Sequence, residues 1–591
     1  MSTSVNRILE ARGATRVRIS PDGTWLGYVT DLTGTPQLWR IPIDGGMPAR
    51  LTFDCDRVGA YRISPDGMRI AYGADAGGNE RWQLHVMNAD GTGDRALTDR
   101  GDRMHHLRGW TPDGRALVAL TNERDPRFFD LVVHPIDGSS ARTLYRHDGT
   151  ASDAVSLPDG AVVLAIHRGR LDRQHLILIA PDGGSRQLTP DEPAALHAIA
   201  GVVERGLVVR SDRERDLVGL AAIGLDGGFR WLVTPDREVE EAESDGRSDA
   251  YALNRDGYSE LHLVDGDRDT IVGGLPAGSL SNDLIGDSVA IRGSTVAVAW
   301  ARYDAPSSIF VARAGQTARE IVPPTLAGLS PSELPETTLV SWRTFDGRTI
   351  PGFLLTPRGA TAGPRPTICQ VHGGPEGQAR PLWNPLTVAL VARGFNVLQP
   401  NVRGSSGYGH AYKTLDDVRL RMDSVKDLDA GAAWLAGSGI APADRIGVIG
   451  GSYGGFMTLA AIAFFPERWA AAVDIVGIGR WRTFLEHTDT WRRPLREAEY
   501  GTLENDAEFL ESISPLNRLE AIRAPLMVIH GANDPRVPVN EAEQMVSALR
   551  GRGRDVEYLR YEDEGHGLAK AKNRADAWPR VVAFFERHLK K

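Results

Sequence analysis

A single serine, Ser452, stands among four glycines in the stretch GVIGGSYGGF (447–456). A β-branched apolar run leads into it, and a run with the pattern of a helix leaves it. This strand–turn–helix context is what a nucleophile elbow requires, because glycines two positions before and after the serine remove side chains that would crowd it. The Gly-x-Ser-x-Gly pattern alone is weak in a chain with 65 glycines among 591 residues. Its context predicts that Ser452 is an exposed nucleophile; the alternative is a tight structural joint.

A serine hydroxyl needs a base, and the base needs an orienting carboxylate. Asp534 follows the apolar run PLMVIHG (525–531), and His566 lies between two glycines after the next apolar run. The chain order Ser, acid, His is that of α/β-hydrolases. We therefore expect Ser452, Asp534 and His566 to form a triad at the carboxyl edge of a sheet. The competing side chains are His487, His530, His588 and Asp563.

His530 ends a strand, where a structural hydrogen bond is the expected role. Asp563 is too close to His566 in sequence to follow the usual order of the triad.

The negative charge that develops on an attacked carbonyl oxygen needs N–H donors already in place. One donor should be the backbone N–H of Tyr453, the residue after the nucleophile. The motif HGGP (372–375) follows an earlier apolar strand, and we expect the N–H of Gly374 to be the second donor. The alternative for this motif is a simple turn.

The second half of the chain supplies the elements that hold these residues. Apolar strands such as TICQV (367–371) and RIGVIG (445–450) alternate with segments of helical period. That alternation predicts a doubly wound α/β sheet of the α/β-hydrolase type over residues 325–591.

The first half repeats a Pro-Asp-Gly turn followed by a β-rich run. A period near 45 residues of short strands and turns is typical of a β-propeller, whose blades bury their faces by stacking. We expect a seven-bladed propeller over residues 1–324, with the first few residues packing on the second domain; a β-solenoid or two small sandwiches are the alternatives. The turn glycines, spaced 40 to 47 residues apart, are Gly23, Gly67, Gly114, Gly160, Gly206, Gly246 and Gly293.

Charge and cysteine content exclude several classes of protein. The net charge of −9 argues against binding to nucleic acid. No stretch approaches 18 apolar residues, and no signal peptide is recognisable, so we expect no membrane association and a cytoplasmic location. The two cysteines, Cys55 and Cys369, lack the spacing of a zinc site or disulfide framework.

Taken together, the motifs resemble those of the prolyl oligopeptidase family of serine peptidases, over nearly the whole chain. The resemblance implies Ser452 as nucleophile, His566 as base and Asp534 as its orienter. It also implies that Arg536 binds the carbonyl of the second substrate residue before the scissile bond (P2); a surface salt bridge is the alternative. The matching motifs are HGGP (372–375), NVRGSSGYG (401–409), GGSYGG (450–455), NDPRVP (533–538) and EGHG (564–567).

Within the family, HGGP and GGSYGG are most similar to the acylaminoacyl-peptidase branch. True prolyl oligopeptidases tend to have a tyrosine where His372 stands, and this departure favours two backbone donors. Dipeptidyl peptidases hold the substrate's free amine with paired glutamates. The acidic stretch Glu238–Glu243 offers such residues, but we interpret it as a solvated acidic loop outside the site.

By the same resemblance, the pocket for the residue before the scissile bond (P1) lies in residues 477–493. Trp481, Phe484 and Trp491 would line an apolar slot there, unless these aromatic residues belong to the core.

We therefore predict a serine peptidase that acts on short peptides or small aminoacyl amides through an acyl-enzyme, without metal or cofactor. The propeller should cap the site and exclude folded proteins. An aminopeptidase, dipeptidyl peptidase or aminoacyl-amide hydrolase that needs a free N-terminus is one alternative. An esterase and a propeller binding protein with an inert hydrolase half are the others. Propeller edges often assemble, which allows a homo-oligomer without fixing its size.

Overall fold

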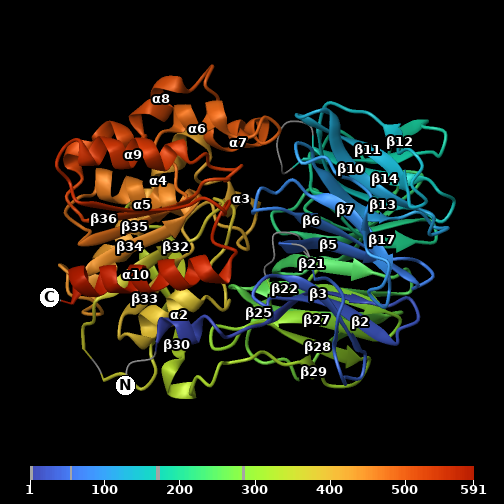
Figure 1. The fold of residues 1–591 in the computed structure, drawn as a ribbon, viewed down its shortest axis with the longest axis horizontal. Coiled ribbons are helices and arrows are strands. Elements are labelled where there is room, and N and C mark those ends of the chain that lie inside the picture. The colour runs from blue at the N-terminus through green and yellow to red at the C-terminus, as the bar shows by residue number, and fades with distance from the viewer. Residues whose placement is uncertain (1–3, 54–55, 168–172, 282–286, 362, 591) are drawn as a thin grey trace.

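The computed structural model describes residues 4–53, 56–167, 173–281, 287–361 and 363–590; Cys55 lies outside these ranges. Two bodies lie side by side, a ring of small sheets and a larger sheet covered by helices (Figure 1). The last strand of the ring ends at Val322, and the first strand of the large sheet begins at Pro335. Among the described helices, none is long and apolar enough to span a bilayer.

The ring is a seven-bladed β-propeller, as predicted, with each blade an antiparallel sheet of consecutive strands. Blades 1 to 3 contain β1–β4 (Ala14–Ile19, Trp25–Thr30, Gln37–Pro42, Ala49–Arg50), β5–β8 (Arg57–Ile63, Arg69–Asp75, Gln83–Asn88, Arg95–Ala96) and β9–β12 (His105–Trp110, Ala116–Asp125, Phe128–Pro135, Arg142–Tyr145). Blades 4 and 5 contain β13–β16 (Thr150–Ser156, Val162–His167, Gln174–Ile179, Ser185–Gln187) and β17–β20 (His197–Val203, Gly206–Ser211, Gly219–Gly224, Phe229–Val233). Blades 6 and 7 contain β21–β24 (Glu238–Ser244, Ser248–Arg255, Tyr258–Asp265, Arg268–Ile271) and β25–β29 (Ser279–Leu280, Val289–Arg292, Thr295–Ala301, Ser308–Arg313, Arg319–Val322).

The repeated Pro-Asp-Gly motif forms the turn between the first two strands of a blade. In blade 1 the Ser20 hydroxyl donates to Asp22 Oδ1 (2.6 Å), and Gly23 has a φ of 72°, which suits glycine. These local bonds explain why the motif recurs at the blade period. The same bond joins Ser64 to Asp66 and Thr111 to Asp113 in the next two blades.

Blades 1 and 7 close the ring without sharing a strand. The N–H groups of Ala14 and Val17 donate to the carbonyls of Ser307 and Asp287, each at 2.8 Å. Arg18 adds ion pairs to Asp287 and Glu243. Ring closure therefore combines these hydrogen bonds and charges with a buried apolar cluster that blades 1 and 7 share.

The large sheet has eight strands in the order β30-β31-β33-β32-β34-β35-β36-β37. The strands from β33 to β37 are parallel to one another, which places their carboxyl ends at one edge. Their bounds are Pro335–Arg343 (β30), Thr349–Pro357 (β31), Thr367–Val371 (β32), Asn396–Pro400 (β33), Ile446–Gly451 (β34), Ala471–Ile475 (β35), Leu526–Gly531 (β36) and Val556–Tyr561 (β37).

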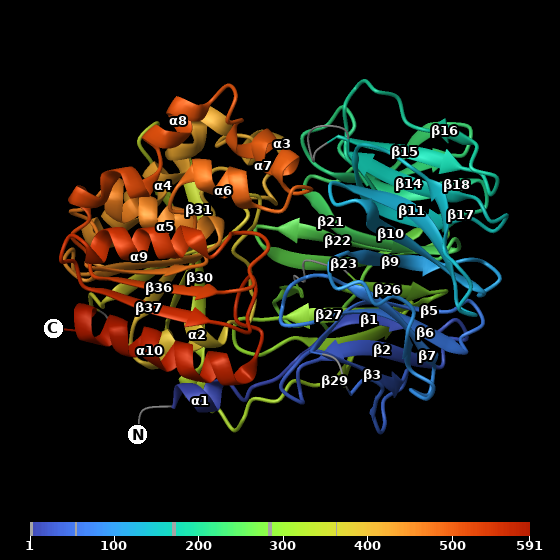
Figure 2. The same cartoon turned by 45° about the horizontal axis from the view of Figure 1, so that its top comes forward.

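Helices cover both faces of this sheet, as in a doubly wound fold. One core includes α4 to α9, and the other includes α2, α10 and α1 (Val5–Ile8), so the start of the chain packs on the hydrolase side (Figure 2). The other bounds are Pro385–Ala392 (α2), His410–Lys413 (α3), Arg421–Gly437 (α4), Tyr453–Phe464 (α5), Trp481–His487 (α6), Arg493–Tyr500 (α7), Ala507–Ser512 (α8), Asn540–Arg550 (α9) and Ala571–Leu589 (α10). Three 3-10 turns cover Pro331–Glu333 (η1), Val418–Leu420 (η2) and Pro515–Ala521 (η3).

Candidate active site

Ser452 sits at a sharp turn between β34 and α5. Its backbone has φ 58° and ψ −121°, a strained conformation for a residue with a side chain. The flanking glycines are required, because a Cβ on Gly450 would lie 2.1 Å from the Gly454 carbonyl oxygen. A Cβ on Gly454 would lie 2.3 Å from the carbonyl oxygen of Val371. The geometry is that of a nucleophile elbow.

Asp534 and His566 lie on loops at the same edge of the sheet, after β36 and β37. His566 Nδ1 is 2.7 Å from Asp534 Oδ2, and Asp534 Oδ1 accepts from the N–H groups of Arg536 and Val537. Burial alone would raise the pKa of Asp534, but the His566 imidazole and these donors bring it below its usual value. Asp534 is therefore held as a carboxylate that is hydrogen-bonded to His566, at the edge of the sheet where Ser452 emerges.

The competing side chains have other roles. His530 is buried, and its Nε2 donates to the Val537 carbonyl (2.9 Å), as a structural histidine would. Asp563 pairs with Lys570 (3.2 Å) and Lys572 (2.7 Å) rather than with His566. His487 is exposed on α6, and His588 packs against Phe584 on α10.

The HGGP loop lies against the elbow. A Cβ on Gly373 would lie 3.4 Å from Ser452 Cβ, so the loop passes beside the serine. Within the described chain, nothing accepts a hydrogen bond from the N–H of Tyr453 or of Gly374. Two backbone donors are thus open near Ser452, which is what an oxyanion hole requires. The His372 ring braces the loop between Gly373 O and Ser405 Oγ, each at 2.9 Å.

A buried ionic network holds the Tyr453 side chain from behind. The Tyr453 hydroxyl is 3.1 Å from both Asp416 Oδ2 and Arg421 Nη1, and Arg421 also binds Glu499. Burial raises the pKa of Asp416 to about 7 and that of Glu499 to about 8. Arg421 supplies the cation among these acidic side chains, which include Asp417. Fixing the Tyr453 ring also fixes the backbone N–H at the head of α5.

A propeller loop between β6 and β7 reaches the same edge. A Cβ on Gly565 would lie 2.0 Å from the Gly78 carbonyl oxygen, so the loop backbone touches the residue preceding His566. Glu80, two residues further, binds Arg536 (Nε to Oε1, 2.9 Å) and Arg492 (Nη2 to Oε2, 2.7 Å). Blade 2 therefore packs directly on the loops that carry Asp534 and His566.

The model of the prolyl oligopeptidase family matches residues 383–591, which include the elbow and both loops. This part of the chain belongs to the prolyl oligopeptidase family. The protein is a serine-type peptidase with a β-propeller and an α/β-hydrolase domain.

Several relatives resemble this peptidase over their length. Dipeptidyl aminopeptidase BIII of Pseudoxanthomonas mexicana is 27% identical and covers 94% of this chain and 84% of its own. The structure of a puromycin-hydrolyzing peptidase of Mycobacterium tuberculosis has a TM-score of 0.86 at 20% identity and covers 100% of this chain and 96% of its own. An acylaminoacyl peptidase in complex with Z-Gly-Gly-Phe-chloromethyl ketone has a TM-score of 0.76 at 19% identity, covering 100% and 98%. At these identities the two structural likenesses bear on the fold.

The predicted aromatic pocket needs correction. Trp481 and Phe484 are 0% and 2% exposed and pack with Phe456 and Tyr500 in the core of the peptidase. A side chain without accessible surface cannot form a pocket wall. Both lie on the buried face of α6, and their spacing of three residues is also that of a core-facing stripe. Trp491 differs, because it lines the cavity between the two domains.

Arg536 lines that same cavity, which has a volume of about 490 Å³. Arg536 does form a salt bridge, as the alternative expected, but with Glu80 across the domain interface rather than on the outer surface. Sequence reasoning missed Glu80: it lies 456 residues from Arg536, and nothing in the propeller repeat marks it.

The Glu238–Glu243 stretch is not a solvated loop. It forms β21, the inner strand of blade 6. Glu240 pairs with Arg380 of the hydrolase domain (2.6 Å), and Glu243 pairs with Arg18 (2.7 Å). Glu241 accepts from backbone N–H groups of blade 7. These carboxylates hold the blades and domains together.

Proposed function

We propose that Ser452 is the nucleophile of this peptidase, that His566 is its base, and that Asp534 orients the base. The Ser452 oxygen attacks the scissile carbonyl carbon while His566 Nε2 takes the hydroxyl proton. The N–H groups of Tyr453 and Gly374 stabilise the oxyanion. His566 then gives the proton to the leaving amine, and the C–N bond breaks.

Water completes the cycle. The water oxygen attacks the carbonyl carbon of the acyl-enzyme while His566 takes a proton from the water. His566 then returns the proton to the Ser452 oxygen as the ester bond breaks. These side chains account for every proton and bond in both halves of the reaction, so the scheme uses no metal or cofactor.

We propose further that the substrates are short peptides whose acyl side carries no free ammonium, as in acylaminoacyl peptidases and oligopeptidases. One observation carries this choice: Glu80, the carboxylate beside the triad, is already held by two guanidiniums. Burial alone would raise the pKa of Glu80, but Arg536, Arg492 and His566 bring it below its usual value. An incoming ammonium would have to displace one of those arginines.

Arg536 would then donate to the P2 carbonyl from its place beside Asp534. The propeller packs over the catalytic loops through Gly78 and Glu80, and this packing supports a preference for short peptides over folded proteins.

A second candidate is an aminopeptidase or dipeptidyl peptidase. The 27% identity to dipeptidyl aminopeptidase BIII over 94% of the chain favours it. It requires Glu80 to release Arg536 or Arg492 and to bind the substrate's ammonium group instead.

Matched p-nitroanilides separate these candidates. We would measure kcat/KM for acetyl-Phe, H-Phe, acetyl-Ala, H-Ala, H-Gly-Pro and a blocked tripeptide ending in Phe, with Ser452→Ala as the blank. The proposal predicts that each blocked substrate exceeds its free-amine partner by about tenfold or more, because the ammonium would be desolvated beside arginines. Turnover of the free-amine substrates alone would overturn it and establish the second candidate.

A further inference from the structure

The cavity between the domains starts beside the triad and extends along the inner strands of the propeller. Its walls come from blades 1 to 4 and from the hydrolase loops near His566. The polar and charged lining residues are Arg16, Arg57, Glu80, His105, His106, Arg108, Ser152, Arg492, Arg536 and Arg574. A volume of about 490 Å³ is in the range of ligand sites.

The lining is strongly cationic. Among the residues named for this cavity, six are arginines and one, Glu80, is a carboxylate. The two histidines add no charge at neutral pH, because burial lowers the pKa of His105 to about 4 and that of His106 to about 3.

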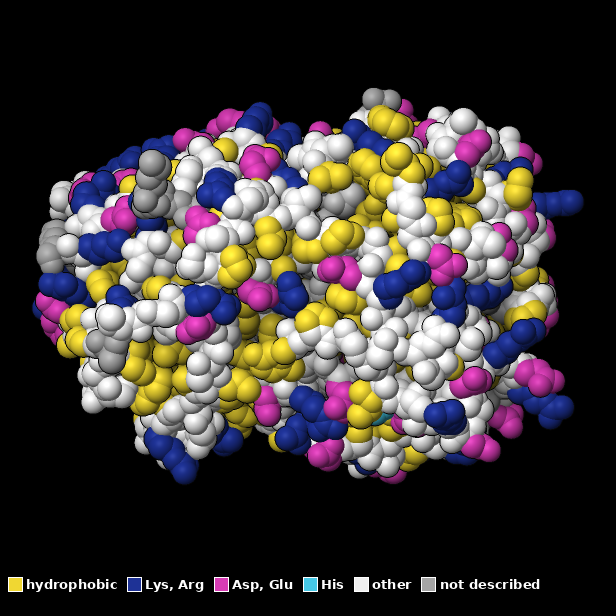
Figure 3. Space-filling view, turned by 90° about the horizontal axis from the view of Figure 1, so that it is seen from below, with side chains coloured by type: hydrophobic (Ala, Val, Ile, Leu, Met, Phe, Trp, Pro, Cys, Tyr) yellow, Lys and Arg dark blue, Asp and Glu magenta, His cyan; other side chains and the backbone are white. Residues whose placement is uncertain are grey.

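The outside of the molecule differs. The chain carries a net charge of −9, and on the face shown in Figure 3 acidic and basic side chains are interspersed. Positive charge is therefore concentrated inside the cavity, although the chain as a whole is negatively charged. A cleft lined by one sign concentrates the opposite charge.

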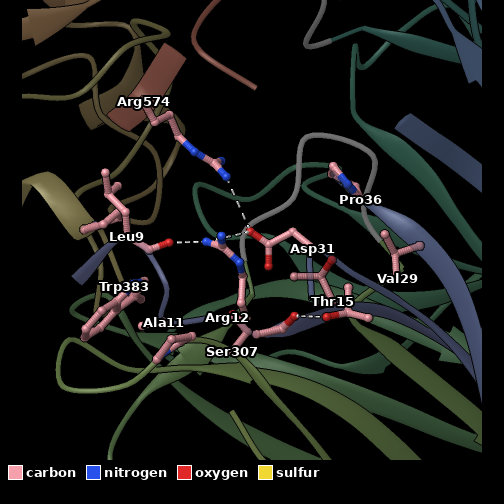
Figure 4. A pocket seen from close by; sticks show the side chains of 14 residues that line it. Leu9, Ala11, Arg12, Thr15, Val29, Asp31, Pro36, Ser307, Trp383 and Arg574 are labelled. Atoms are coloured by element: carbon pink, nitrogen blue, oxygen red, sulfur yellow. Dashed lines mark hydrogen bonds and ion pairs between the residues drawn. The ribbon is translucent and has the colours of Figure 1, made fainter. Parts of the chain in front are cut away.

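The carboxylates near these arginines are shared. Glu80 serves both Arg492 and Arg536. Asp31 serves both Arg574 (3.7 Å) and Arg12 (3.9 Å), in a neighbouring smaller cavity that Figure 4 shows.

Arg57 is matched differently from the others. Its guanidinium forms two hydrogen bonds to one carboxylate, that of Asp75, at 2.8 and 2.7 Å.

Arg108 is the least compensated of the lining arginines for which a carboxylate contact is described. Its nearest carboxylate is Asp153 at 3.9 Å, beyond hydrogen-bond distance, and its Nε has no hydrogen-bond partner. The Nε of Arg492 also lacks a partner. Burial lowers the pKa of Arg108 and, with neighbouring arginines, brings that of Arg492 to about 10. A guanidinium keeps its charge in proteins at neutral pH.

We propose that this cavity binds a carboxylate on the acyl side of the substrate, that of an aspartate or glutamate side chain. Arg108 and Arg492 would donate to the carboxylate, while Trp82 and Met104 would pack on its carbon stem. This inference rests on the proposed function and specifies its substrate class.

The test compares peptides that differ in the charge of one side chain, and the Asp and Asn peptides are isosteric. The substrates are p-nitroanilides of acetyl-Asp-Ala-Phe, acetyl-Asn-Ala-Phe and acetyl-Lys-Ala-Phe, and the same series with the varied residue next to Phe. We expect the Asp peptide of at least one series to exceed its Asn partner about tenfold in kcat/KM, mainly through KM, and to exceed the Lys peptide by more. The Asp/Asn ratio should fall as salt is raised.

Two variants of one residue separate charge from shape. Arg108→Met removes the cation at similar size and should bring the Asp/Asn ratio close to one, whereas Arg108→Lys should keep most of it. Arg268→Met, exposed on blade 6, is the matched control and should leave the ratio unchanged. A general loss of folded enzyme lowers kcat/KM for the Asp and the Asn peptide equally, so it cancels in their ratio.

Calorimetry on the Ser452→Ala variant measures the same preference without turnover. The Asp peptide should bind about tenfold more tightly than the Asn peptide. Equal dissociation constants in both series, or a ratio that Arg108→Met does not change, would overturn the inference. If the Asn peptide is cleaved normally in that case, the proposed function stands; if no blocked peptide is cleaved while calorimetry shows the Asp preference, the proposed function fails and the carboxylate site stands.

Discussion

The catalytic edge of the hydrolase sheet and the propeller wall that faces it are organised in opposite ways. At the edge, Ser452, Asp534 and His566 each sit in a short motif at the end of a parallel strand, and Asp534 pairs with His566 at 2.7 Å. In the cavity across from it, three arginines of the propeller meet three of the hydrolase domain, and the carboxylate among the lining residues is Glu80. The two proposals therefore place the bond-breaking chemistry in local motifs and substrate selection in residues hundreds of positions apart.

Breaking the local half should have the largest effect. Replacing Ser452 by alanine removes the proposed nucleophile without disturbing its glycine-rich turn, and we expect kcat on a blocked anilide to fall roughly 10⁴- to 10⁶-fold. The melting temperature should stay close to that of the wild type, since alanine keeps the same Cβ at this strained φ. A variant that keeps more than about one per cent of the activity would remove Ser452 from the role of nucleophile.

The contact between the two regions is the next place to intervene. In Gly565→Ala the new Cβ would lie 2.0 Å from the Gly78 carbonyl oxygen, which forces the His566 loop and the propeller loop apart. A displacement of about 1 Å at a catalytic group costs roughly 100-fold in kcat/KM. Gly551→Ala is the matched control, because Gly551 has a helical backbone at the exposed end of α9. Equal activities of the two variants would show that the propeller loop does not position His566.

Glu80→Gln sharpens the comparison at the side chain that joins both regions. The amide keeps the shape of Glu80 but loses the ion pairs to Arg536 and Arg492. We expect kcat/KM for a neutral blocked tripeptide anilide to fall about tenfold, through KM, because Arg536 loses the partner that holds it. Asp102→Asn, on an exposed propeller loop, should leave the kinetics unchanged.

The free-amine series decides what that loss means. If Glu80→Gln instead abolished turnover of H-Phe p-nitroanilide and spared the blocked tripeptide, Glu80 would be an ammonium ligand, and the second candidate function would replace the first.

The smallest effect concerns stability behind the catalytic edge. Asp474, at the end of β35, is buried without a cation beside it in the described part of the chain, and burial raises its pKa to about 8. The native state therefore binds more protons than the unfolded state between about pH 4 and 8, so the free energy of unfolding falls as pH rises through that window. Each ionising group of this kind contributes at most about 1.4 kcal/mol per pH unit.

Asp474→Asn should reduce that decline, because the amide does not titrate. Urea unfolding at pH 5, 6, 7 and 8 gives the free energy of unfolding of variant and wild type, and the change of their difference with pH is the contribution of Asp474. Asp416, Glu499 and Glu541 also have raised pKa values, but they are present in both proteins and cancel in the difference. A difference that does not change with pH would show that Asp474 is not the group responsible.

The parts of the site that could be predicted are those with a local signal. The elbow around Ser452 follows from its glycines, and the order of Asp534 and His566 follows from the strands that precede them. The propeller follows from turn chemistry that repeats at the blade period in the first blades, such as the bond from Ser20 to Asp22.

The rest depends on contacts that no short motif records. In the sequence, Glu80 and Arg108 do not differ from other polar residues of a blade, and only the packing of the two domains shows their position in the cavity. Trp481 and Phe484 have the helical spacing that a core stripe and a pocket wall share, so burial alone decides between them. The acidic composition of β21 resembles that of a solvated loop. The arginines that pair with it, Arg380 and Arg18, lie in distant segments, so the local sequence does not reveal them.

The most direct test of the account is the rate at which a fluorophosphonate labels the enzyme, with the labelled peptide mapped by mass spectrometry. We predict one label per chain on Ser452, none in Ser452→Ala, and labelling at least about 1,000-fold slower in His566→Gln. A label on another residue, or labelling that persists in Ser452→Ala, would contradict the claim that the motif around Ser452 carries the chemistry.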